Sequence, residues 1–186
     1  MKIRLAAYLQ SDSIVDGEGI RTVVWTQGCP HKCLGCHNPE THDFEGGTLV
    51  DLEEVYEIID SLEGQDGITF SGGDPFVQPK ECAKIAEYAK SKGLNIWAYT
   101  GYTFEHLFVL AEKKTEIMDF LKQIDVLIDG KFELSKKSYN CIFRGSSNQR
   151  IIDVQKSLKK KKVILVSKYE NVNKLSNREK QVGVYI

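Results

Sequence analysis

The sequence predicts an α/β protein whose parallel strands form a partial barrel, open on one side, with helices on its outside. Two observations predict this fold: short apolar runs alternate with helical patterns, and distinctive polar or glycine-containing loops follow the expected strands. Such alternation implies right-handed crossovers and a parallel sheet. The barrel should be partial because 186 residues are too few for eight strand–helix units.

The length and composition indicate a single domain spanning residues 1–186, with 41% hydrophobic residues for its core. The formal net charge of −1, from 25 basic and 26 acidic residues, gives no reason to expect binding to nucleic acid or an anionic membrane. Polar residues interrupt the N-terminal apolar run, and no later segment approaches the roughly 20 apolar residues of a membrane span. We therefore expect a cytoplasmic protein.

The first expected strand is the apolar run at 21–27, which ends directly before Gly28 and Cys29. A helix with one buried face should follow, and Thr48 with Asp51 forms an approximate capping box before it. The apolar residues of that helix recur at helical spacing and are Leu52, Val55, Ile59 and Leu62.

Three further strands are expected at 67–70, 94–100 and 125–130, with helical patterns between them. The first of these helices should end near Gly93, and the second should extend from about Phe104 to Leu121. The apolar face of the first helix consists of Cys82, Ile85, Ala86 and Ala89.

After about residue 132 the pattern is harder to assign. Four lysines at 159–162 indicate an exposed turn, and the apolar run at 163–168 indicates another strand.

Distinctive loops follow the carboxyl ends of the four main strands: the cysteine loop, SGGDP at 71–75, TGY at 100–102 and DGK at 129–131. In parallel α/β proteins this edge of the sheet is where ligands bind. The sequence therefore predicts a binding site there.

The cysteine loop holds Cys29, Cys33 and Cys36, three of the five cysteines in the chain. A reducing cytoplasm favours ligands or reactive thiols over a disulfide framework. A zinc site would need a fourth ligand, for which His31, His37 and His42 are candidates. A redox pair would use Cys33 and Cys36 and leave Cys29 idle. Simple burial conflicts with the polar neighbours.

An iron–sulfur cluster is the fourth interpretation. The C-x-x-x-C-x-x-C spacing suits a tight loop around one cubane, in which three irons carry thiolates and the fourth is open to a substrate or cofactor. The spacing alone does not choose among the four interpretations.

Several motifs resemble a known superfamily. "GCPHKCLGCHNP" resembles the cluster loop of radical S-adenosylmethionine enzymes, and "SGGDP" resembles their glycine-rich loop. "VDGEGIRTVVWTQGC" and the "CHNP" ending are similar to activating enzymes of glycyl-radical enzymes. "WAYTGY", "VLIDGKF" and "FRGSSNQRIID" resemble, more narrowly, activators of anaerobic ribonucleoside-triphosphate reductase. The resemblance covers about residues 10–155 and assigns no role to the extension at about 155–186.

The resemblance implies a barrel of the radical S-adenosylmethionine type, with the cluster and cofactor sites within about residues 16–131. A 4Fe-4S cluster would be bound by Cys29, Cys33 and Cys36. The position before the third cysteine is often aromatic in the superfamily but is Gly35 here, so the resemblance implies that backbone from Gly35 through Cys36 to His37 holds the adenine of S-adenosylmethionine.

The remaining expected cofactor contacts lie in two later loops. Gly72 and Gly73 lack a Cβ, which lets the backbone approach the methionyl group. Asp74 would either orient this loop or receive the ammonium group. Asp129 and Lys131 suit a ribose hydroxyl and a carboxylate, respectively, with an exposed turn as an equal alternative.

The resemblance implies an oxygen-sensitive enzyme that makes a glycyl radical on the reductase, with flavodoxin or ferredoxin as electron donor. The alternatives are an activator of the pyruvate formate-lyase type, a radical enzyme acting on a nucleotide-like compound, and a zinc-stabilised binding module. Cys82 is expected in the core, and Cys141 has similar apolar neighbours. Arg21 and Arg144 would meet either the protein partner or a polar network.

Overall fold

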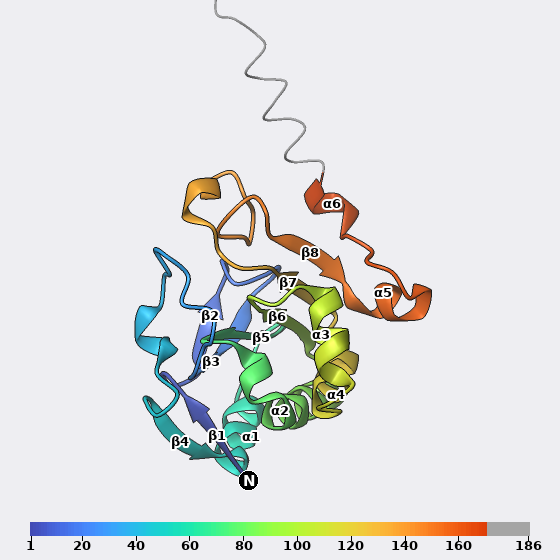
Figure 1. Cartoon of the computed structure of the whole chain (residues 1–186). Coiled ribbons are helices and arrows are strands. Elements are labelled where there is room, and N and C mark those ends of the chain that lie inside the picture. The colour runs from blue at the N-terminus through green and yellow to red at the C-terminus, as the bar shows by residue number, and fades with distance from the viewer. Residues whose placement is uncertain (171–186) are drawn as a thin grey trace, which may run out of the picture.

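The computed structural model describes residues 1–170, which form one open mixed sheet with helices against it (Figure 1). The order across the sheet is β4-β1-β3-β5-β6-β7-β8, and β2 pairs with β3. The strands are β1 (Lys2–Leu5), β2 (Gln10–Ser13), β3 (Arg21–Thr26), β4 (Thr48–Asp51), β5 (Gly67–Gly72), β6 (Asn95–Tyr99), β7 (Val126–Asp129) and β8 (Arg150–Asp153).

The centre of the sheet is parallel and its margins are antiparallel. β3, β5, β6 and β7 pair in parallel, with Val24 opposite Phe70 and Phe70 opposite Ala98. β1, β2, β4 and β8 run antiparallel to their neighbours. The predicted parallel α/β arrangement is confirmed for the four central strands, while the antiparallel strands on both sides were not expected.

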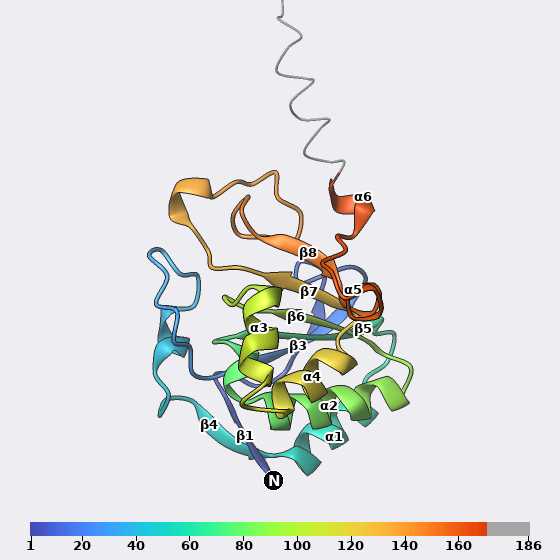
Figure 2. The same ribbon diagram turned by 45° about the vertical axis from the view of Figure 1, so that its right-hand side comes forward.

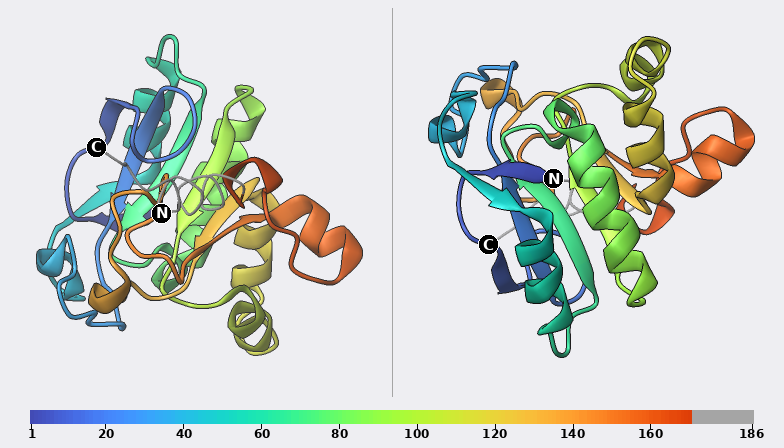
Figure 3. Two further views of the ribbon diagram at one scale, coloured as in Figure 1. Left: turned by 90° about the horizontal axis from the view of Figure 1, so that it is seen from above. Right: turned by 90° about the horizontal axis from the view of Figure 1, so that it is seen from below.

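Helices cover one face of the sheet, as the views in Figure 2 and Figure 3 (right) show for α1, α2 and α4. The helices are α1 (Leu52–Asp60), α2 (Pro79–Ser91), α3 (Phe104–Ala111), α4 (Glu116–Gln123), α5 (Val154–Lys160) and α6 (Ser167–Glu170). Three short 3₁₀ helices add η1 (Pro39–His42), η2 (Pro75–Val77) and η3 (Leu134–Lys136).

The main core lies between the sheet and helices α1, α2, α3, α4 and α5. Alternate residues of β5, such as Ile68 and Phe70, are fully buried in it, and each contributes roughly 1.5–3 kcal/mol. The predicted apolar faces of α1 and α2 are confirmed, because their members are buried in this core: Leu52, Val55, Ile59, Cys82, Ile85, Ala86 and Ala89. Leu62 packs against the core just beyond the end of α1.

The opposite face of the sheet carries a smaller apolar cluster made of Trp97, Ile128, Ile151 and Tyr169. The segment 130–149, which connects β7 and β8, crosses this face (Figure 3, left). Its Phe143 ring lies 5.4 Å from the Trp97 ring. One sheet thus has a helix-covered face and a loop-covered face.

Three local predictions are wrong. The stretch Phe104–Leu121 is not one helix, because Glu112–Thr115 separate α3 from α4. Thr48 and Asp51 do not form a capping box: they belong to β4, and the Asp51 side chain makes no capping hydrogen bond.

The run 163–168 is not a strand, because its only bridge is between Leu165 and Ile152, and α6 begins at Ser167. β8 occupies the edge position instead.

The lysines at 159–162 are exposed, as expected, but the first two complete α5, and the turn begins at Lys161 with φ of 51°. The extension expected at about 155–186 begins with α5 and α6, and its part at 171–186 lies outside the described residues. Across residues 1–170, no helix combines the length and apolar character needed to cross a membrane.

Candidate functional site

A pocket of about 150 Å³ lies at the carboxyl ends of the central strands. All three cysteines of the cysteine loop line this pocket, which we call the cysteine pocket. They lie opposite the loops that follow β5, β6 and β7. Its lining consists of Cys29, His31, Cys33, Cys36, His37, Asn38, Thr41, His42, Ser71, Gly72, Gly73, Tyr99, Thr100, Gly101, Gly130, Phe132 and Gln149. The predicted convergence of loops at this edge is therefore confirmed.

The cysteine loop is anchored where it leaves β3. The buried Gln27 side chain donates to the carbonyls of Glu40 and Asp43, at 3.1 and 2.7 Å, which holds the two ends of the loop together. Gly28 has φ of 94°, a conformation that favours glycine, and its amide donates to the Thr41 carbonyl at 2.9 Å. These contacts direct the next residues away from the sheet and over the pocket.

The three thiols differ in exposure. Cys29 is 9% exposed, whereas Cys33 and Cys36 are half-buried and joined by a turn, with the Cys36 amide donating to the Cys33 carbonyl at 3.1 Å. Burial raises the pKa of the Cys29 thiol to about 11, although a hydrogen bond from the His31 backbone opposes the rise. A metal centre bound here must therefore displace a proton from Cys29.

The donor set of the pocket includes three thiols, the number that would bind three irons of a cubane. Among residues 1–170, no three His, Cys, Asp or Glu side chains are close enough to share one metal ion. A cubane does not need such a group, because each thiolate binds a different iron. His31, one candidate fourth zinc ligand, instead contacts Asp74.

The SGGDP segment at 71–75, which we call the glycine loop, packs against the start of the cysteine loop. Gly72 has φ of 96°, and a Cβ on Gly73 would lie 2.3 Å from the Gly28 carbonyl oxygen. The Gly73 amide donates to the Thr26 carbonyl at 2.7 Å. Only glycine permits this backbone approach, so both predicted glycines line the pocket for a steric reason.

Asp74 is buried behind the pocket wall. Its Oδ1 accepts from the Phe76 amide at 3.0 Å, and its Oδ2 accepts from the Gly101 amide at 3.0 Å and from His31 Nε2 at 2.7 Å. The Thr100 hydroxyl donates to both carboxylate oxygens. Asp74 was expected either to orient its loop or to receive the ammonium group of the cofactor. Its contacts with three neighbouring segments fit the first role.

Asp129 and Lys131 lie in a neighbouring pocket of about 620 Å³, which also contains His31, Gly101 and Gly130 of the cysteine pocket. Asp129 is 1% exposed; it accepts from the Phe104 amide at 2.7 Å.

Asp129 also forms an ion pair with Arg150, whose guanidinium further binds Glu105 at 2.8 and 3.0 Å. The hydrogen bonds from Arg150 lower the pKa of the Glu105 carboxyl to about 2. Lys131 is exposed.

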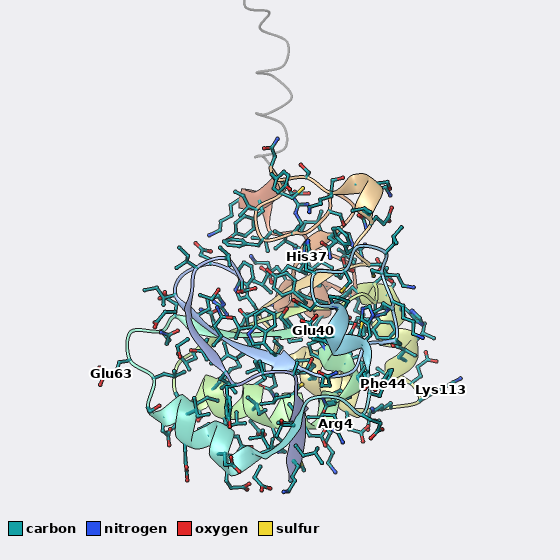
Figure 4. The ribbon with its side chains drawn as sticks, turned by 90° about the vertical axis from the view of Figure 1, so that its left-hand side faces the viewer. Arg4, His37, Glu40, Phe44, Glu63 and Lys113 are labelled. Atoms are coloured by element: carbon teal, nitrogen blue, oxygen red, sulfur yellow. The ribbon has the colours of Figure 1, made fainter. Side chains whose placement is uncertain are left out.

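Gly35 and His37 lie at the outer side of the cysteine loop, and both are exposed. Gly35 has φ of 73° and packs against Leu134 of η3. The His37 ring lies 5.1 Å from the Phe132 ring, beneath the segment that follows β7 (Figure 4). His37 lines the cysteine pocket, whereas Gly35 is not among its lining residues.

A larger pocket of about 540 Å³ opens on the loop-covered face of the sheet. It shares six lining residues with the cysteine pocket, so the two are continuous: His37, Asn38, Ser71, Tyr99, Phe132 and Gln149. Burial raises the pKa of Tyr99, whose hydroxyl donates to the Phe143 carbonyl at 3.0 Å.

Sequence reasoning missed Tyr99, Phe132 and Gln149 as site residues. The "WAYTGY", "VLIDGKF" and "FRGSSNQRIID" segments that contain them were the available signal.

The residues without an assigned role are now placed. Arg21 is fully buried in a polar network at the other end of the strands, and Arg144 lines the 540 Å³ pocket and donates to the Gln149 carbonyl. Cys82 is buried in the main core, as predicted, and burial raises its pKa. Cys141 is 9% exposed and lines the 540 Å³ pocket.

Comparisons with known proteins identify the family of the chain. A family model described as "4Fe-4S single cluster domain" matches residues 15–152. The anaerobic ribonucleoside-triphosphate reductase-activating protein of Pasteurella multocida (strain Pm70) is 36% identical over 149 residues, which is 74% of this chain and 90% of the relative. The chain belongs to the anaerobic ribonucleoside-triphosphate reductase-activating protein family.

Further members of this activating-protein family match at similar levels. The protein of Enterobacteria phage T4 is 34% identical over 143 residues, covering 74% of this chain and 86% of the relative. The protein of Escherichia coli (strain K12) is 34% identical over 145 residues, covering 73% of this chain and 90% of the relative. The matched range contains the whole cysteine pocket, and the family model supports an iron–sulfur cluster in this chain.

Proposed function

We propose that this protein is a radical S-adenosylmethionine enzyme that generates a glycyl radical on anaerobic ribonucleoside-triphosphate reductase. One observation carries the proposal: three thiols from one loop line a pocket whose other wall is the glycine loop, and this pocket continues into a larger cavity. The family membership and the names of the relatives support the reductase as the protein substrate.

In this proposal Cys29, Cys33 and Cys36 each hold one iron of a 4Fe-4S cluster. The bound cluster would supply the electron that cleaves S-adenosylmethionine into methionine and a 5′-deoxyadenosyl radical. The residues around the cluster would bind and orient S-adenosylmethionine and would exclude water from the pocket. The proposed fold is correspondingly the open barrel of this superfamily, contained in the single domain 1–186.

The proposed cofactor contacts divide according to their surroundings. Backbone at Gly72 and Gly73 can approach the methionyl group because no side chain intervenes. Backbone from Gly35 to His37, through Cys36, is proposed to contact adenine. The polar groups of S-adenosylmethionine would bind at the carboxyl ends of the strands, where Asp74, Asp129 and Lys131 lie. Asp74 and Asp129 would act through the loops that they hold in place.

The 540 Å³ pocket gives the partner access to the cysteine pocket. A glycine-containing segment of the reductase would enter along the loop-covered face and present its Cα hydrogen to the cofactor. We propose a cytoplasmic enzyme with flavodoxin or ferredoxin as electron donor.

The test is an anaerobic reaction of reconstituted protein, reductant and S-adenosylmethionine with the reductase, followed by electron paramagnetic resonance. A stable carbon-centred radical doublet should form on the reductase, and deuterium on its glycine Cα should appear in 5′-deoxyadenosine. A radical without deuterium transfer would contradict direct abstraction. Activation of pyruvate formate-lyase instead of the reductase would assign the other partner, and modification of a nucleotide-like compound without a protein would make the chain a small-molecule enzyme.

Cysteine variants test the ligand assignment. Cys29→Ala, Cys33→Ala and Cys36→Ala should each abolish formation of 5′-deoxyadenosine, because each removes the ligand of one iron. Cys82→Ala is the matched control and should retain the reaction, since Cys82 lies in the core. Bound zinc without iron or sulfide would replace the radical proposal with a zinc-stabilised binding module.

A further inference from the structure

Two buried side chains connect the cysteine loop to the glycine loop. His31 Nε2 lies 2.7 Å from Asp74 Oδ2, and the side chains are only 6% and 1% exposed. Because the carboxylate accepts, the His31 ring donates through Nε2. A charged acceptor makes this a strong hydrogen bond.

The same carboxylate holds a third loop. The Thr100 hydroxyl and the Gly101 amide, both just after β6, donate to Asp74 at 2.9 and 3.0 Å. Asp74 therefore gathers loops from three strands, and His31 is the contribution of the cysteine loop.

The position of the His31 ring is tightly defined. Its ring packs edge-on against Tyr102, with the ring centres 4.5 Å apart. On the other side, a Cβ on Gly101 would lie 2.3 Å from the His31 ring. Tyr102 and Gly101 thus pack against the ring in the orientation that points Nε2 at Asp74.

The backbone of His31 connects this ring to a thiol. The His31 backbone N–H favours the thiolate form of Cys29 and so opposes the rise in the pKa of that thiol. Since the ring and the amide belong to one residue, holding the ring also holds the donor that faces Cys29, and it fixes the path of the loop toward Cys33.

We propose that His31 and Asp74 are positioning residues, whose contact holds the cysteine loop against the glycine loop in the conformation that retains the cluster. The inference rests on the proposed function, because it takes Cys29, Cys33 and Cys36 as cluster ligands. Neither side chain needs to touch the cofactor, since both act through the loops that they join.

The test measures how fast full-length, anaerobically reconstituted protein releases iron to a chelator. In His31→Leu the side chain cannot donate, and release should be roughly 10- to 100-fold faster, the factor expected for losing a hydrogen bond to a charged group. In His31→Gln the side-chain amide can replace Nε2–H, and release should remain within about threefold of wild type. His106→Leu is the control, because His106 also packs against Tyr102 but is exposed.

Thermal unfolding of the same samples separates positioning from general destabilisation. The expected result is faster iron release by a His31→Leu protein that is still folded at the assay temperature, with rescue by His31→Gln. Equal release by wild type and His31→Leu, or equally fast release by both His31 variants, would overturn the inference. If His31→Leu does not fold, Asp74→Asn takes its place, and release at the wild-type rate would overturn the inference.

Cluster loading of the wild type distinguishes the two proposals. Wild-type protein that takes up no iron and sulfide would overturn the proposed function together with this inference. A loaded wild type whose His31→Leu variant retains iron equally well would overturn the inference alone.

Discussion

Arg21 and Asp74 are both buried charged side chains, but they lie at opposite ends of the parallel strands. Arg21 begins β3 and donates to the Thr69 hydroxyl at 2.6 Å and to the Ile68 carbonyl at 2.8 Å. Asp74 follows β5 and accepts from the loops around the cysteine pocket. A buried charge at the amino ends thus fastens strands together, whereas one at the carboxyl ends arranges loops.

Neutral acceptors and one aromatic ring surround the buried Arg21 guanidinium. Burial lowers the pKa of Arg21 to about 10. The hydrogen bonds that its guanidinium makes within residues 1–170 go to neutral acceptors. The Arg21 guanidinium lies 5.3 Å from the centre of the Trp97 ring, which adds a cation–π contact. We therefore expect variants at the two ends to separate global stability from the integrity of the site.

Arg21→Met should have the largest effect on stability, about 3 kcal/mol, because several buried acceptors lose their donor. Iron content per folded molecule should stay at the wild-type level, since Arg21 lies far along the strands from the pocket. Urea unfolding of the cluster-free chain and iron analysis measure the two effects. Iron loss in folded Arg21→Met would break the distinction between the ends.

Gly73→Ala should cost about 2 kcal/mol, because the new Cβ would lie 2.3 Å from the Gly28 carbonyl oxygen. The shift of Gly28 would displace the adjacent Cys29, so we expect marked loss of iron as well. Gly93→Ala is the control: its positive φ of 84° costs about 1 kcal/mol, but no atom lies within 4 Å of the added Cβ. Equal iron retention in both variants would contradict the prediction.

Thr100→Val removes a hydroxyl that donates to Asp74 at 2.9 Å, and it should cost about 1 kcal/mol. Iron release to a chelator should become faster, because the carboxylate loses one of its connections. Thr22→Val is a matched control, since the buried Thr22 hydroxyl bonds Gln65 at 3.1 Å near the amino ends. The control should lose similar stability without faster release; identical release from both would sink the prediction.

Glu105→Gln should have the smallest effect, below about 1 kcal/mol, because the Glu105 side chain is 60% exposed and water screens its pairing with Arg150. The pair lowers the pKa of Glu105 from 4.5 to about 2. Its contribution is therefore present above pH 4.5 and disappears as the pH falls to about 2. Urea titrations across this range should show the wild type and variant converging at low pH; a constant difference would exclude this origin.

The four central strands could be predicted because each is an apolar run between turn signals, and the loops after them could be placed on one edge. β2 could not, because its residues 10–13 are polar and mostly exposed. Pairing with β3 stabilises it, and that pairing is not visible in the local sequence. The break between α3 and α4 lacks glycine or proline, so helical periodicity ran through it.

The candidate site was predictable to a different extent for thiols, glycines and carboxylates. Cys29, Gly72 and Gly73 were placed at the pocket by motif spacing and by their position after strands. Asp74 and Asp129 also follow strands, but a carboxylate that binds a ligand and one that organises loops look identical in sequence. Only the tertiary structure shows both aspartates buried among protein donors.

The segment 130–149 starts and ends on β7 and β8, two adjacent antiparallel strands with the register Asp129–Arg150. Changes of length within it would therefore leave the strand pairing intact and add little loop-closure entropy. The segment provides Gly130, Phe132 and Gln149 to the cysteine pocket but none of the three cysteines that line it. Evolution can accordingly remodel the entrance for a different protein substrate while inheriting the cysteine and glycine loops unchanged.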